Sequence, residues 1–165
     1  MGPTEVNGLP AHILLVHVVV VLVPLAALFT ILSTLWPAGR RRLGIITPLT
    51  ALAALIAVPL TTHAGEWLEA RVFSTALIRH HVAIADGLLP WVIGLFVTAV
   101  AAYAYHRYAT RADEPATGRA PVAVVLAVLA LVAGAGSVAQ VYRIGDSGSK
   151  AVWTGVFSPR PRTGN

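Results

Sequence analysis

The chain has 165 residues, of which 56% are hydrophobic and only 12% are charged. A soluble domain carries about twice this share of charged residues. The charges also stand in short stretches between long apolar tracts, which is typical of transmembrane helices and not of a water-soluble enzyme. Because the chain contains no cysteine, disulfides, thiolate metal sites and cysteine nucleophiles are excluded. Any metal or haem iron would have to be held by histidine or carboxylate.

The net charge of +5 comes mainly from arginine, since Lys150 is the only lysine. A basic chain can indicate nucleic-acid binding, but these arginines stand in connectors and in the tail, beside apolar spans. Anionic lipid headgroups and membrane topology account better for that placement. We therefore expect the lipid bilayer as a partner and no nucleic acid.

Four apolar tracts predict an all-α integral membrane four-helix bundle with antiparallel, up-down topology. Met1–Pro10 has no Lys or Arg, and the apolar run after it is longer than the core of a signal peptide. We therefore expect the first span to remain in the mature protein. The predicted segments, in chain order, are an N-terminal segment (1–12), spans at about 13–36, 43–63, 80–105 and 120–142, and an interfacial and disordered tail (143–165).

The arginines also predict the topology. Arg40–Arg42 in the first connector and Arg107, Arg111 and Arg119 in the third connector share one side of the membrane. The positive-inside rule makes that side cytoplasmic, so both termini are expected to be extracytoplasmic, although the tail carries basic residues too. A bias toward arginine and alanine is typical of GC-rich bacterial genomes. We expect a multi-pass protein of the bacterial inner membrane.

Five of the six histidines fall at span ends on the other, extracytoplasmic side: His12, His17, His63, His80 and His81. Ionisable groups that cluster at membrane depth usually mark an ion path, a proton relay or a cofactor site. His106 lies on the opposite side and is interpreted as a loop histidine. No nucleophile elbow, phosphate loop or dinucleotide motif is present, so no catalytic residue is predicted.

Helical geometry limits how these histidines can act together. His12 and His17 are about 140° apart on a helix, so they cannot chelate one ion by themselves. His17 lies deeper in the span and is predicted to be the better buried of the two. His63 and Glu66 are three residues apart and could bind a divalent ion, or the carboxylate could orient the imidazole. At most one of His80 and His81 should face the bundle.

Asp86 is the only carboxylate well inside a predicted span, so we expect it to face the interior and to pair with a donor. The fourth span contains small residues four apart, Ala130 with Gly134 and Ala133 with Ser137. Such pairs let helices approach closely. They leave open a homo-oligomer or docking on a larger complex.

Four short segments form a recognisable set: Gly8–His17 at the mouth of the first span, Thr62–Glu66 after the second, His80-His81, and Tyr142–Gly148. Together they resemble a bacterial membrane family known as domain of unknown function 2231. The resemblance extends from about Gly8 to Trp153. It departs from the family pattern at Ile13, where proline is expected, and at Val18-Val19, where Phe-Pro is expected. The resemblance implies a four-helix membrane protein without an established activity. Some relatives are joined to Rieske or cytochrome-type domains, which favours electron transfer by analogy.

Three functions remain open from the sequence. The first is b-type haem held by His17 with His81 or His63, with Asp86 and Glu66 in supporting or proton roles, and with electrons passing between quinone and an extracytoplasmic redox partner. The second is transport or sensing of a divalent metal ion. The third is an accessory subunit without a cofactor, whose histidines only make hydrogen bonds. The candidate metal ligands are His12, His17, His63, Glu66, His81 and Asp86.

Overall fold

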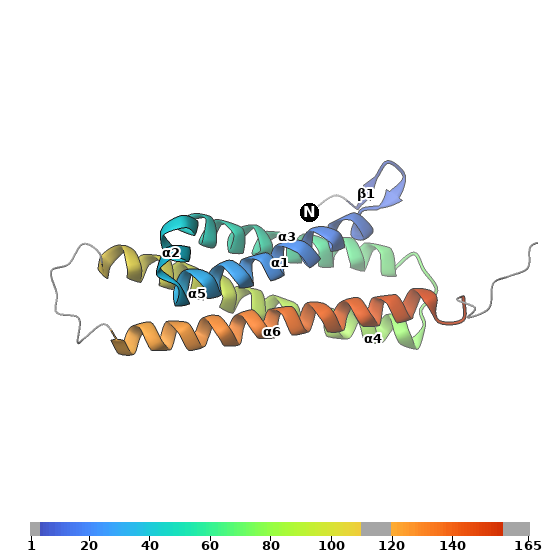
Figure 1. Ribbon diagram of the computed structural model, residues 1–165. Coiled ribbons are helices and arrows are strands. Elements are labelled where there is room, and N and C mark those ends of the chain that lie inside the picture. The colour runs from blue at the N-terminus through green and yellow to red at the C-terminus, as the bar shows by residue number, and fades with distance from the viewer. Residues whose placement is uncertain (1–3, 110–119, 157–165) are drawn as a thin grey trace, which may run out of the picture.

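The computed structural model describes residues 4–109 and 120–156. They form a bundle of long helices with a small hairpin at its N-terminal end (Figure 1). Within these residues, four helical stretches are long and apolar enough to cross a membrane: Ala11–Leu35, Ile46–Glu69, Ala76–Tyr108 and Ala120–Trp153. The predicted all-α membrane bundle is therefore confirmed. The elements are β1 (Glu5–Val6), β2 (Leu9–Pro10), α1 (Ala11–Leu35), α2 (Pro37–Leu43), α3 (Ile46–Glu69), α4 (Ala76–Ala85), α5 (Leu88–Ala109) and α6 (Ala120–Trp153).

The N-terminal segment contains an antiparallel hairpin in which Val6 pairs with Leu9. Asn7 and Gly8 form its turn, with φ of 51° and 76°. Both angles are positive, as a two-residue type I′ turn requires, and Asn-Gly is the sequence best suited to such a turn. The hairpin brings the chain directly into α1, whose first amide, at Ala11, donates to the carbonyl of Thr4 at 2.9 Å.

The third span is broken into α4 and α5, whereas the sequence predicted one helix over 80–105. Pro90 explains the break, because proline lacks an N–H and its ring clashes with the carbonyl four residues earlier, that of Asp86. Asp86 therefore caps α4 and is exposed. The expectation that Asp86 faces the bundle interior is wrong.

Two helices run further than expected. α6 continues past Tyr142 to Trp153, so the fourth helix extends into the segment that was expected to be an interfacial and disordered tail. Gly145 and Gly148 are weak helix formers, but this part of α6 packs along α4, and packing outweighs weak helix propensity. α5 continues to Ala109, so His106 lies in a helix and not in a loop. The rest of the predicted loop (110–119) and of the tail (157–165) lies outside the described residues.

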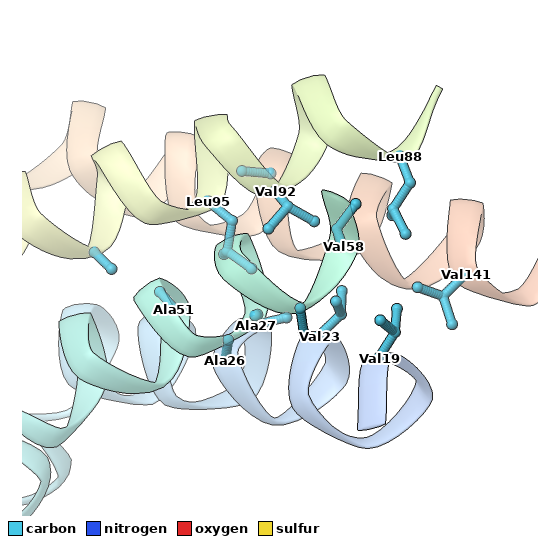
Figure 2. Close-up of a cluster of buried hydrophobic side chains, with 14 residues drawn as sticks. Val19, Val23, Ala26, Ala27, Ala51, Val58, Leu88, Val92, Leu95 and Val141 are labelled. Atoms are coloured by element: carbon cyan, nitrogen blue, oxygen red, sulfur yellow. The ribbon is translucent and has the colours of Figure 1, made fainter. Parts of the chain in front are cut away.

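The core is made of small and branched apolar side chains from the four spans (Figure 2). Val23 of α1 and Val92 and Leu95 of α5 are fully buried there. The small residues of α6 are also used inside the bundle: Ala130 and Ser137 are buried, and Gly134 faces Ile31 of α1. These close-packing positions therefore do not form a surface for a second copy of the chain.

Helix lengths indicate which part projects from the membrane. α5 has 22 residues, a length of about 33 Å, which matches a hydrocarbon core of about 30 Å. α6 has 34 residues and is about 51 Å long. The excess length of α6 lies beside α4 (Figure 1). We call this pair the cap: α4 together with residues 143–153 of α6.

Candidate functional site

Histidines gather at the cap end of the bundle. His12 lies at the start of α1, His63 near the end of α3, and His80 and His81 in α4. The start of α1 and the ends of α3 and α6 lie at the same end of the molecule (Figure 1). Two of these histidines face other helices and form the candidate site, and the others lie on the surface.

His12 connects α1 to α3. Its Nδ1 donates to the carbonyl oxygen of Thr61 at 3.0 Å. A carbonyl can only accept, so Nδ1 carries the proton, and in the neutral ring Nε2 keeps its lone pair. The ring also lies against Gly65, where a Cβ would come within 3.0 Å of the imidazole Cε1. The absence of a side chain at Gly65 therefore makes room for His12.

His81 connects α4 to α6 in the same way. Its Nδ1 lies 2.9 Å from Oγ of Ser147, and that hydroxyl donates to the carbonyl of Ile144 at 2.8 Å. Since a hydroxyl has one proton, Nδ1 of His81 must be the donor to Ser147 when Ser147 bonds Ile144. The His81 ring lies against Gly148, where a Cβ would be 3.1 Å from Cε1. Here too Nε2 keeps its lone pair.

The two rings lie at the same level of the bundle. Val19 of α1 and Val141 of α6 belong to one buried cluster and lie next to each other (Figure 2). Because α1 and α6 run in opposite directions, moving about two turns from this contact brings His12 to the level of Gly148. We call His12 and His81 the imidazole pair.

His17 lies outside this pair, contrary to the prediction that it is better buried than His12. It is on the bundle surface, and its Nδ1 donates to the carbonyl of Ile13 in its own helix at 2.7 Å. His12 and His17 are about 140° apart around α1, so only one of them can face α3. The sequence showed that the two could not act together but not which one faced inward.

The other predicted site residues are dispersed. His63 lies two residues from Gly65 and therefore on a nearly opposite face of α3. Its side chain is 44% exposed, and its Nδ1 is 3.9 Å from Oε2 of Glu66. His80 and Asp86 are exposed. Over residues 4–109 and 120–156, no group of three or more His, Asp or Glu side chains is placed to hold a metal ion.

Two cavities lie at the cap end of the molecule, and neither is lined by the imidazole pair. A cavity of about 160 Å³ lies between α4 and α6, and a shallower one of about 410 Å³ lies at the end of α6. Sites for cofactor-sized ligands enclose about 300–1,000 Å³. Neither His12 nor His81 lines either cavity. Neither of these two cavities therefore lies between the two rings.

Gln140 is a buried polar residue that the sequence reading did not single out. Its Nε2 donates to the carbonyl of Ile84 at 2.6 Å, beside the break between α4 and α5. Gln140 is the only glutamine of the chain, and it lies in an apolar helix. A single amide side chain in such a helix indicates a hydrogen bond to another helix, and this could have been noticed in the sequence. Gln140 supplies a donor to a carbonyl at the helix break and ties the cap to the bundle.

Arg40 stabilises the opposite end of the molecule. Its guanidinium donates to the carbonyls of Ser33 and Thr34, at 3.3 Å from Nε and 3.2 Å from Nη2. Burial lowers the pKa of Arg40 from its usual value, and Tyr105 partly opposes this change. An arginine beside the last carbonyls of a helix is favoured by the helix dipole. One of the arginines in the first connector therefore also caps α1.

The chain was compared with known proteins. The family described as "Predicted membrane protein (DUF2231)" matches residues 8–158. Comparisons with curated proteins and with solved structures gave no match. The family match spans all four membrane-crossing stretches, the imidazole pair and the cap. This chain belongs to the family of membrane proteins known as domain of unknown function 2231.

Proposed function

We propose that this protein is an accessory membrane subunit whose imidazole pair fastens helices together and binds no cofactor. The observation that supports this proposal is how both inward histidines are used. His12 joins α1 to α3 through Thr61, and His81 joins α4 to α6 through Ser147. Each ring also rests on a glycine of the facing helix. Interhelical hydrogen bonds are an ordinary use of histidine in membrane bundles.

Substitution of His12 tests this role. Replacing His12 with alanine should lower the free energy of unfolding in detergent by about 1 kcal/mol, because the Thr61 carbonyl loses its donor. His12→Asn should retain most of the stability, since the amide nitrogen of asparagine can occupy the place of Nδ1. His17→Ala, on the bundle surface, is the matched control and should change stability by less than about 0.5 kcal/mol. The measurement is a denaturant titration followed by far-UV circular dichroism.

Two results would count against the structural role. One is equal stability of His12→Ala and the wild type. The other is an unfolding free energy for His12→Asn as low as that of His12→Ala. Asparagine keeps a donor in the place of Nδ1 and lacks only the Nε2 side of the ring, so it should preserve the bond to Thr61. Either would mean that the bond to Thr61 is not what His12 contributes.

A second candidate function, b-type haem binding in electron transfer, is favoured by the orientation of the two rings. Iron- and metal-ligating histidines usually donate one ring N–H to an oxygen, as His12 and His81 do, and present the other nitrogen to the metal. Haem would supply one-electron chemistry between quinone and a redox partner. His12 and His81 would hold the haem, in place of His17. This candidate requires the helices to separate from Gly65 and Gly148, and it predicts that His12→Asn loses the cofactor.

We also propose that the protein lies in a bacterial inner membrane with the cap outside the cytoplasm. The support is the arginine distribution: Arg40–Arg42 and Arg107 lie at the end opposite the cap. Because the chain has no cysteine, single cysteines can report the topology. Ser74→Cys, exposed beside the cap, should react with a membrane-impermeant maleimide in intact spheroplasts, and Arg42→Cys only after lysis. The reverse labelling pattern would place the cap in the cytoplasm.

A further inference from the structure

We propose that the cavity between α4 and the cap part of α6 binds the phosphate of an anionic lipid headgroup. We call this cavity the headgroup notch. Its volume is about 160 Å³. A water molecule takes about 30 Å³, so the notch has room for a phosphate and part of the glycerol beside it. Its lining combines charged or polar side chains with apolar ones: His80, Arg143, Asp146, Lys150, Ile84 and Tyr142.

The charge balance of the notch favours an anion. Lys150 is already neutralised, because its Nζ lies 2.6 Å from Oδ2 of Asp146. Arg143 has no ion pair within residues 4–109 and 120–156. The notch therefore carries an unopposed guanidinium, with the imidazole of His80 as a second donor. A guanidinium can bind two phosphate oxygens at once, which makes it well suited to such a ligand.

The position of the notch matches the level of lipid headgroups. It begins at Ile84 and Tyr142, close to the helix break, where α5 starts to cross the hydrocarbon core. Tyr142 is 76% exposed. Tyrosine is enriched at the boundary between hydrocarbon and water. Arg143 is the next residue along α6, so its charge lies at that boundary.

An apolar stripe on α6 provides a path for the lipid chains. Val138 lies one turn before Tyr142, and Leu131 and Val124 lie further along the same helical face. All four side chains are exposed on the outside of the bundle. This stripe leads along the helix to the notch. A soluble phosphate would not use it, which is why we favour a lipid over free phosphate.

Titration of the purified full-length protein with lipid tests this proposal. The probes are phosphatidylglycerol and phosphatidylcholine, and binding is followed by native mass spectrometry. We expect preferential binding of phosphatidylglycerol, and we expect Arg143→Gln to weaken it by about tenfold, the typical result of losing one charge-assisted contact. Arg143→Lys keeps the charge but cannot bind two phosphate oxygens at once, so it should weaken binding less than Arg143→Gln does. Arg79→Gln is the matched control, because Arg79 is an exposed arginine of α4 that bonds Ser74 and does not line the notch.

Three results would overturn the proposal. Equal weakening by Arg143→Gln and Arg79→Gln would mean that only the total surface charge matters. Unchanged phosphatidylglycerol binding in Arg143→Gln, with native circular dichroism, would place the lipid elsewhere. Displacement of phosphatidylglycerol by millimolar inorganic phosphate would identify the notch as a site for soluble phosphate. None of these results depends on whether the imidazole pair binds a cofactor.

Discussion

Gly136→Ala is expected to have a free energy of unfolding lower than that of Gly145→Ala by about 1–3 kcal/mol, the usual cost of overpacking. Gly136 of α6 lies directly under the indole ring of Trp91 in α5, and a Cβ there would overlap Cε3 and Cζ3 of that ring. The ring would have to rotate away from α6 and would lose its packing against Gly136. Far-UV circular dichroism during denaturation in detergent measures the effect.

Gly145→Ala provides the matched control for this experiment. Gly145 lies in the same helix, and a Cβ there would meet nothing within 4 Å. Alanine is the better helix former by about 1 kcal/mol, so this variant should be as stable as the wild type or more stable. If the two alanine variants were equally stable, the close approach of α5 and α6 at Gly136 would be disproved.

Gln140→Leu is expected to loosen the cap and to cost about 1 kcal/mol, the usual net contribution of one hydrogen bond. The Ile84 carbonyl keeps its bond from the Gly87 amide at 3.2 Å, but the bond that joins it to α6 is lost. The effect should be local, because the bond joins α6 to α4. Hydrogen exchange should become faster in α4 while the amides of α1 and α3 remain protected.

Two results would contradict this role of Gln140. Faster exchange throughout the bundle would mean that Gln140 supports the whole fold and not the cap. Unchanged exchange in α4 would mean that the bond to Ile84 contributes nothing measurable. Gly87→Ala should disturb the same bond between Gln140 and Ile84, because a Cβ at Gly87 would lie 2.9 Å from Nε2 of Gln140.

The sequence predicted the spans well because their signal is local. An apolar tract long enough to cross the bilayer must be helical, since backbone groups in hydrocarbon need internal partners. The break at Asp86 was also encoded locally, in Pro90, but the apolar tract around it masked the signal. The extension of α6 was not encoded locally. Gly145 and Gly148 favour a helix end, and contact with α4 keeps the helix going.

The candidate site was predictable only in part. Hydropathy placed the histidines at one end of the molecule, and helical spacing required His12 and His17 to point in different directions. Which of them faces α3 depends on the partner surface at Thr61 and Gly65, and this pairing is set by the fold. The same holds for His81, whose partner Ser147 lies 66 residues away in the chain. Contacts between residues so far apart in the chain cannot be predicted from the spacing of residues within one helix.

The most direct test of the accessory role is a reduced-minus-oxidised visible spectrum. It should be recorded on the full-length protein purified in detergent from cells that are well supplied with haem, together with His12→Asn. Our account predicts no haem band in either sample and a native circular dichroism spectrum in both. A sharp α-band in the wild type that disappears in His12→Asn would contradict it. That result would establish the imidazole pair as a haem site.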